Sequence, residues 1–267
     1  MVSLAAATWP NAIRSGAAAA TNTGASSVAS NGSRLPAPAG GAGVGPGIGS
    51  ITAAAMSIAF PAGPAPLGVP GRGWIVTTSA PLAIHSSDGG PVVETLGATN
   101  QFSNPTTLGV IGIPSHDWAA VILPQRPNGS TGWVHTPDVA VTWTPYSIEV
   151  SRAARSLTVL RGDQAIFSSP VSVGRAGAPT PSGTTYLYES IPMMPANGPY
   201  GPFIFGLALF SNSYQSWNGQ VPQIGIHGND DPGGIGHPIS HGCIRLPNAA
   251  ITQLSTLLPL GTPVTVT

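Results

Sequence analysis

The sequence predicts a mainly β protein whose carboxyl-terminal half is a β-sandwich or meander with one or two short helices. A small β-barrel and a disordered amino-terminal arm precede this half. Three observations support this fold class. From Trp74 onward, short runs rich in β-branched and aromatic residues are separated by Gly, Pro and Asn clusters. Residues 146–161 alternate apolar with polar side chains, and a single segment near the end has apolar residues at helical spacing.

Residues 1–71 are predicted to form a low-complexity arm or linker. Stretches such as AGGAGVGPGIGS are rich in Ala, Gly, Ser and Pro and nearly free of charge. Such segments cannot bury enough apolar surface to offset the entropy lost on ordering. An export signal is not evident, because no basic residue precedes Arg14 and the alanine run after it is too short for an apolar core.

Residues 72–143 are predicted to form the small β-barrel. The runs WIVTT, LGVIGI, WAAVIL and GWV have strand composition, and SSDGG, IPSHD and PQRPNGSTG are the turns between them. The closing segment TGWVHTPDVAVTW resembles the end of a bacterial SH3-like module. We therefore expect an SH3-like barrel here.

Residues 146–267 are predicted to form the second β unit. YSIEVSR and RSLTVLR alternate, and QAIFSS follows a tight turn at Gly162-Asp163, which together indicate a meander with one buried face. TTYLYES, FIFGLALF and VPQIGIH supply further strands. One helix is expected from Pro247 to Leu257, because proline suits a first helical turn and apolar residues recur at helical spacing. LGTPVTVT then closes the unit as a strand.

Composition excludes several classes of function. Charged residues make up 7% of the 267 residues, the net charge is zero, and every basic residue is Arg. Binding to nucleic acid or to an anionic membrane needs clustered cationic charge, so neither partner is expected. No apolar run is long enough for a transmembrane segment. The single cysteine cannot form an internal disulfide, so it is either a small buried apolar residue or a reactive thiol.

The segment IGIHGNDDPGGIGHPISHGCIRL at residues 224–246 holds that cysteine and three of the six histidines. Taken from the residues alone, three interpretations are open. Cys243 could be a nucleophile assisted by a histidine, with uncrowded glycine amides ready to bind an oxyanion. His237, His241 and Cys243 could bind zinc, although Pro238 disfavours a helix that would put both histidines on one face. Cys243 could also be a structural residue in a glycine-rich loop.

A resemblance favours the first interpretation. The strings IHG and SHGCIRL, followed by Pro-Asn and a helix, resemble the catalytic signature of the L,D-transpeptidases, the cysteine enzymes that cross-link bacterial peptidoglycan. VSVGRAGAPTPSGTTYL, YGPFIFGLALF and LLPLGTPVTV resemble further parts of the same catalytic domain. The resemblance covers residues 146–267.

This resemblance implies a role for individual residues. Cys243 corresponds to the nucleophile, and His227 to the catalytic imidazole, oriented by the backbone carbonyl of Gly228. The main-chain N–H groups of Gly242 and Cys243 are the implied oxyanion donors. The residues expected on the substrate side are His241, Arg245 and Ser240.

The resemblance also implies an activity. Cys243 would form a thioacyl enzyme from a donor stem peptide, and an acceptor stem peptide would resolve it into a 3→3 cross-link. Carbapenem-type β-lactams would acylate the same thiol, no metal or organic cofactor would be needed, and the enzyme would act outside the cytoplasmic membrane. Two alternatives are an L,D-carboxypeptidase that trims stem peptides with water and a non-catalytic wall-binding protein.

Overall fold

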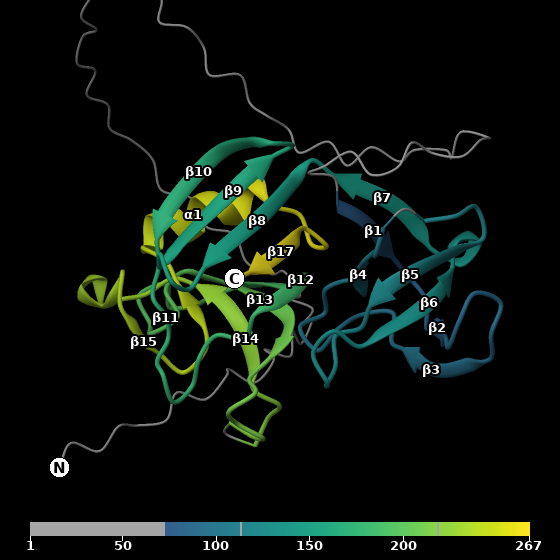
Figure 1. Ribbon diagram of the computed structural model, residues 1–267, viewed down its shortest axis with the longest axis horizontal. Helices are drawn as coiled ribbons and strands as arrows, with labels where there is room; N and C mark the ends of the chain where they lie inside the picture. The colour runs from purple at the N-terminus through teal and green to yellow at the C-terminus, as the bar shows by residue number, and fades with distance from the viewer. Residues whose placement is uncertain (1–72, 113, 218) are drawn as a thin grey trace, which may run out of the picture. The chain divides into compact units, whose positions relative to one another are not determined.

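The computed structural model describes residues 73–112, 114–217 and 219–267, all of which fall in one compact unit. The predicted low-complexity arm and the first residue of the predicted barrel lie outside the described residues. Within them the protein is mainly β, as predicted (Figure 1). The single described α-helix lies near the carboxyl terminus.

The amino-terminal half of the described chain contains two small sheets, with strand orders β4-β1-β7 and β3-β2-β6-β5. An isolated bridge between Val110 and Val121 connects the end of β4 to β5. The predicted run LGVIGI is shorter than expected as a strand and ends at Gly109. The SH3-like identity of this half stays a prediction. Its elements are β1 Gly73–Thr77, β2 Leu82–His85, β3 Val92–Leu96, β4 Thr107–Gly109, β5 Trp118–Ile122, β6 Thr131–His135, a 3-10 turn Thr136–Asp138 and β7 Ala140–Thr144.

These strands pack around a buried cluster that includes Leu108 and Val134. The cluster also contains Tyr186 and Ala208, which belong to the second half of the chain. The Tyr186 hydroxyl donates to the carbonyl of Ile122 at 3.1 Å. The predicted boundary at 143–146 therefore separates two halves that share buried apolar surface.

A loop of the amino-terminal half also binds β12 of the second half, through asparagine side chains that bond to backbone groups. Asn100 Nδ2 donates to the Tyr188 carbonyl at 3.1 Å. The Asn104 side chain pairs with both backbone groups of Ser190, accepting from its N–H at 2.9 Å and donating to its carbonyl at 3.3 Å. Hydrogen bonds to backbone groups hold this loop in one register along the strand.

The carboxyl-terminal half contains an eight-stranded sheet in the order β10-β9-β8-β17-β12-β13-β14-β16. Neighbouring strands are antiparallel except for the pairs β17–β8 and β14–β16. The predicted meander of the first three strands is confirmed, with Gly162 at φ +60° in its tight turn. The elements are β8 Tyr146–Ser151, β9 Ser156–Arg161, β10 Gln164–Pro170, β11 Val173–Gly174, β12 Gly183–Pro192, β13 Phe203–Phe210, β14 Gln223–His227, a 3-10 turn Pro232–Gly234, β15 Pro238–Ser240, β16 Ile244–Arg245, α1 Asn248–Leu257 and β17 Pro263–Val266.

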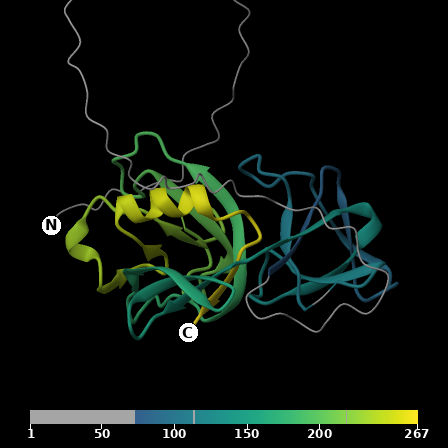
Figure 2. The ribbon, with the colours of Figure 1, turned by 90° about the horizontal axis from the view of Figure 1, so that it is seen from above.

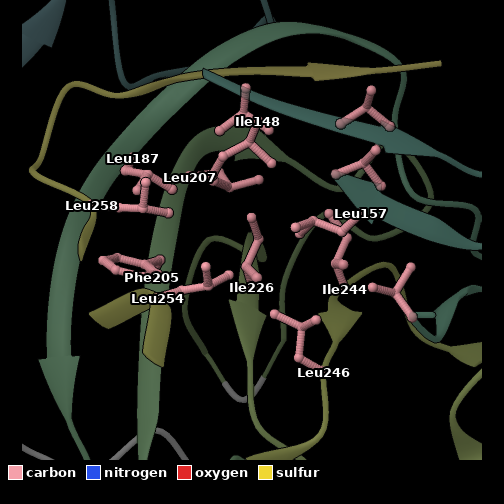
Figure 3. Packing of buried hydrophobic residues seen from close by; sticks show 14 of the residues in the cluster. Ile148, Leu157, Leu187, Phe205, Leu207, Ile226, Ile244, Leu246, Leu254 and Leu258 are labelled. Carbon is pink, nitrogen blue, oxygen red and sulfur yellow. The ribbon is translucent and has the colours of Figure 1, made fainter. Parts of the chain in front are cut away.

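Helix α1 covers one face of this sheet, next to β13 and β14 (Figure 2). Its buried residues Ile251 and Leu254, with Leu258 just after its end, are spaced by three and four positions and so share one face. Pro247 is the N-cap residue, so the helix begins at Asn248, one position after the predicted start. Figure 3 shows Leu254 and Leu258 among side chains from the strands, including Phe205 and Ile226.

The parallel pair β14–β16 places the histidine strand beside the cysteine. Parallel strands need a crossover connection, and here the 16 residues between His227 and Ile244 provide it. Within that connection, β15 pairs with β11 in a separate two-stranded sheet. In the described part of the chain, no helix is long and apolar enough to cross a membrane.

Candidate active site

Strand register brings the cysteine and the first histidine together. Ile226 pairs with Ile244 and His227 with Arg245. Side chains alternate along a strand, so His227 and Arg245 lie on the face opposite the buried isoleucines, and Cys243 shares that face. Standard strand spacing gives a Cα separation of roughly 8 Å between Cys243 and His227 across the diagonal. Their side chains can therefore approach each other over the glycine at position 225.

His227 is buried, with 2% of its surface exposed. Its Nδ1 lies 2.5 Å from the carbonyl oxygen of Gly228. A carbonyl only accepts, so Nδ1 carries the proton and Nε2 is left as the free acceptor. Burial and the charge of Arg245 lower the pKa of His227 to about 4, although the bond to Gly228 opposes this shift. The imidazole is therefore neutral at pH 7.

Gly228 is tightly enclosed, which fixes the carbonyl that orients the ring. A Cβ at this position would lie 2.3 Å from Asn248 Oδ1 and 2.9 Å from the Cα of Gly201. The same Asn248 oxygen accepts a hydrogen bond from Asn229 N–H at 2.8 Å. Asn248, the first residue of α1, thus fixes the backbone that follows His227.

Cys243 is partly exposed, and its sulfur accepts a hydrogen bond from Gly225 N–H at 3.4 Å. Burial raises the pKa of the Cys243 thiol, while the Gly225 N–H and the charge of Arg245 act in the opposite direction. Desolvation therefore favours the neutral thiol and the neutral imidazole.

The turn between His241 and Cys243 is locked by side-chain hydrogen bonds. Ser240 is fully buried, and its Oγ accepts from Gly242 N–H at 3.1 Å and donates to the Cys243 carbonyl at 2.6 Å. Ser240 therefore shapes the turn, and the expectation that it contacts substrate is corrected. Gly242 adopts φ +127°, and its carbonyl accepts from Thr180 Oγ1 at 2.8 Å. A side chain at Gly242 would be strained by this φ.

The two expected oxyanion donors differ in whether their N–H groups are already hydrogen-bonded. The Gly242 N–H is already engaged by Ser240 Oγ. In the described part of the chain, the Cys243 N–H makes no hydrogen bond to a protein group. The Cys243 amide is therefore available to an incoming oxygen, whereas the Gly242 amide would first have to leave its serine partner.

Arg245 supplies the positive charge of the site. It acts on the pKa of Cys243, His227, His241 and Tyr200, which places its guanidinium near all four groups. Its Nε is buried without a hydrogen-bond partner among the described residues. No ion pair in that part of the chain joins an arginine to a carboxylate. No carboxylate among the described residues therefore neutralises this cation.

His241 is partly exposed, and its ring packs against Trp217 with ring centroids 4.8 Å apart. Partial burial and the charges of Arg175 and Arg245 lower its pKa. His237 is held elsewhere, with its carbonyl accepting from Val173 N–H. Among the described residues, no group of three or more His, Cys, Asp or Glu side chains is placed to hold a metal ion.

Three groups at the site were not anticipated from the sequence. The Tyr200 ring packs edge-on against His227 with centroids 5.0 Å apart, and its pKa is raised by burial and by the neighbouring Cys243. Gly225 donates to the sulfur, and Asn248 braces the loop after His227. Only Asn248 had a sequence signal, because it belongs to the Pro-Asn pair that follows SHGCIRL at the start of the predicted helix. The other two are placed by strand pairing and a loop.

Comparison with known proteins identifies the carboxyl-terminal half. The family model for the L,D-transpeptidase catalytic domain, YkuD, matches residues 145–266. This half of the chain belongs to the L,D-transpeptidase family. The predicted family is thereby confirmed.

Relatives of this L,D-transpeptidase domain are found among curated proteins and solved structures. The chain is 29% identical over 175 residues to "Putative L,D-transpeptidase YkuD" of Bacillus subtilis, covering 63% of this chain and 98% of that protein. It is 33% identical over 124 residues to the protein of the same name in Bacillus licheniformis, covering 46% and 66% respectively. A solved L,D-transpeptidase from Mycobacterium smegmatis is 16% identical, with 58% and 93% coverage and a TM-score of 0.37.

Proposed function

We propose that this protein is a peptidoglycan L,D-transpeptidase that forms 3→3 cross-links through a thioacyl intermediate on Cys243. Cys243 Sγ attacks the carbonyl of the third residue of a donor tetrapeptide stem and forms a C–S bond. The bond to the terminal D-Ala nitrogen breaks, and D-Ala leaves. The side-chain amine of an acceptor stem then attacks the thioester, forms the new amide and releases the thiol.

His227 carries the protons through both halves of this cycle. Since the pKa of Cys243 is raised and that of His227 is about 4, the resting pair is a neutral thiol and a neutral imidazole. Nε2 takes the thiol proton as sulfur attacks and gives it to the departing amine of D-Ala. In the second half it takes a proton from the acceptor amine and returns it to the sulfur. The Gly228 carbonyl stabilises the imidazolium formed in each step.

The negative charge of each tetrahedral intermediate needs a donor and a cation. The free Cys243 N–H is the first candidate donor, and Gly242 N–H is a second if it exchanges away from Ser240. Arg245 contributes positive charge beside the sulfur. We assign it the further task of binding a carboxylate of the donor stem. His241 stands at the entrance on the substrate side.

The observation that carries the proposal is the shared face of β14 and β16. The strand register sets Cys243 and His227 side by side, with Nδ1 of the imidazole anchored and Nε2 left free. A structural cysteine would require neither an anchored histidine nor a neighbouring unpaired arginine. Because the peptidoglycan substrate lies outside the cytoplasmic membrane, we propose that the protein works there.

Incubation of the protein with a carbapenem, followed by intact-mass measurement, tests the nucleophile. We expect one covalent adduct on the wild type and none on Cys243→Ala. The His227→Ala variant should acylate about 10²- to 10⁴-fold more slowly, the usual contribution of a general base. His241→Ala serves as the matched imidazole control and should keep measurable activity. An adduct that survives in Cys243→Ala would refute the assignment.

The reaction itself is tested by muropeptide analysis with disaccharide-tetrapeptides. A 3→3 linked dimer, with D-Ala released in equal amount, supports transpeptidation. Tripeptide with no dimer, at any acceptor concentration, would instead identify an L,D-carboxypeptidase. Neither product from folded protein that still takes up a carbapenem would reject both activities.

A further inference from the structure

Two aromatic side chains of the β13–β14 loop pack against His241, which is close in sequence to the proposed nucleophile. Trp217 and Tyr214 pack against His241, with ring centroids 4.8 and 6.1 Å away, and His241 is two residues before Cys243. Tyr214 and Trp217 also pack against each other at 5.2 Å. We call Tyr214, Trp217 and His241 the aromatic wall. Its three members are partly exposed, so their faces are available to a ligand.

One arginine from the amino-terminal half holds the loop that carries this wall. Arg126 Nη2 donates to the carbonyls of Ser211 and Tyr214, both at 2.6 Å. Its Nη1 donates to Gln215 Oε1 at 3.1 Å and to the Gln215 carbonyl at 3.4 Å. A planar guanidinium reaches all of these acceptors at once because its donors form a fixed fork.

A second residue of the same turn fixes the start of the loop. Asn128 Oδ1 accepts from Phe210 N–H at 2.8 Å, and its Nδ2 donates to the Phe210 carbonyl at 2.7 Å. Arg126 and Asn128 both belong to the turn between β5 and β6, which is 80 or more residues away in sequence. The wall is therefore positioned from outside the carboxyl-terminal half.

The loop also has hydrogen bonds of its own. Trp217 and Gln220 exchange backbone hydrogen bonds at 2.9 and 3.0 Å, and Ser211 Oγ accepts from the N–H groups of Ser213 and Tyr214. Arg175 Nη2 donates to the Tyr214 hydroxyl at 3.2 Å. Arg126 differs from these because it binds the loop backbone from the amino-terminal half through charge-assisted hydrogen bonds, which are stronger than neutral ones.

We propose that Arg126 is a positioning residue that holds the aromatic wall in place for the sugar-peptide substrate. This inference rests on the proposed function, because the wall includes His241, which is close in sequence to the thiol that the function uses. Aromatic faces bury the apolar surface of sugar rings and peptide chains at little entropic cost. The amino-terminal half thus contributes to substrate affinity without touching a reacting atom.

Steady-state kinetics with a disaccharide-tetrapeptide, combined with Trp217 fluorescence, tests this role. In Arg126→Ala the aromatic wall should be ordered in only a fraction of the molecules. If that ordered fraction falls to about a tenth, KM should rise about tenfold. The kcat and the rate of thiol alkylation by iodoacetamide should stay within twofold, because Cys243 and His227 are untouched. Trp217 emission, isolated by subtracting the Trp217→Phe spectrum, should shift toward that of solvent-exposed tryptophan.

Two further variants separate positioning from general stability. Arg126→Lys keeps the charge without the fork and should restore KM only in part. Arg161→Ala removes an exposed arginine whose side chain makes no hydrogen bond to a described residue, and should leave KM and emission unchanged. If Arg126→Ala unfolds, Trp217→Ala removes the wall directly and should raise KM by a similar factor.

The double variant gives the deciding result. If Arg126 acts through the wall, the KM effects of Arg126→Ala and Trp217→Ala are less than multiplicative when combined. A multiplicative combination, or an unchanged KM in Arg126→Ala with shifted Trp217 emission, would overturn the proposal. The emission and alkylation readouts do not depend on turnover. If the wild type has no transpeptidase activity, the proposed function is rejected. The effect of Arg126 on the loop can still be measured from the emission and alkylation readouts.

Discussion

Replacing Glu189 by glutamine should make the protein more stable at alkaline pH. Glu189 lies on β12 with 1% of its surface exposed. Its Oε1 accepts from Gln101 Nε2 at 3.1 Å, while Oε2 is buried without a hydrogen-bond partner among the described residues. Glutamine has nearly the same shape and keeps an oxygen for Gln101, but it removes the carboxylate charge.

The size of the effect follows from the pKa of Glu189. Burial raises this pKa from 4.5 to about 7, against the smaller opposing influence of Gln101 and Gln223. Between pH 4.5 and 7 the native state holds a proton that the unfolded chain has lost. The stabilisation is therefore complete below pH 4.5 and disappears as the pH rises through 7. A difference of 7 − 4.5 = 2.5 pKa units corresponds to about 3 kcal/mol, of which about 2 to 3 kcal/mol falls between pH 5 and 8.5.

Urea unfolding at a series of pH values measures this difference. Relative to Glu189→Gln, the wild type should lose about 2 to 3 kcal/mol from pH 5 to pH 8.5, a midpoint shift of roughly 1 M urea. Glu149→Gln is the matched control, because Glu149 is an exposed glutamate on β8. Parallel stability profiles for the wild type and Glu189→Gln would show that the carboxyl is solvated in solution and that the reasoning is wrong.

Two further predictions follow from the site. The rate of carbapenem acylation should be nearly constant between pH 5.5 and 8 and half lost near pH 4, where His227 takes up a proton. An acid limb centred near pH 6.5 would show an ordinary imidazole instead. Ser240→Ala should destabilise the protein by about 1 to 3 kcal/mol in urea unfolding, because it leaves the Gly242 N–H without its partner. Ser213→Ala, at an exposed position, should have almost no effect.

The meander at the start of the second half could be predicted from local pattern. Residues 146–161 alternate because one face of the meander is buried, and Gly162 marks its turn, since a left-handed φ favours glycine. Helix α1 was visible from the spacing of Ile251 and Leu254. By contrast, β16 has two residues and pairs with a strand 18 residues away. Its pattern is too short to indicate a strand.

The candidate site was found in part because its signature is contiguous. Cys243 and His227 belong to strings that resemble one family, so both could be named from the sequence. Tyr200 and Arg126 could not, because their roles depend on packing against His227 and on the Ser211 and Tyr214 carbonyls. The protonation of Cys243 and His227 could not be read from the sequence either. A pKa depends on how completely the group is desolvated, and desolvation is a property of the packed interior.

The sequence by itself determined the β class and the family of the second half, and it predicted which residues we propose as nucleophile and imidazole. Each depends on residue types at short range along the chain, where periodicity and spacing carry the information. Tertiary structure alone decided that the resting thiol is neutral, that Ser240 supports the turn, and that the two halves share a core through Tyr186. These properties arise from contacts between residues far apart in sequence, and such contacts form only when the strands have paired and excluded water.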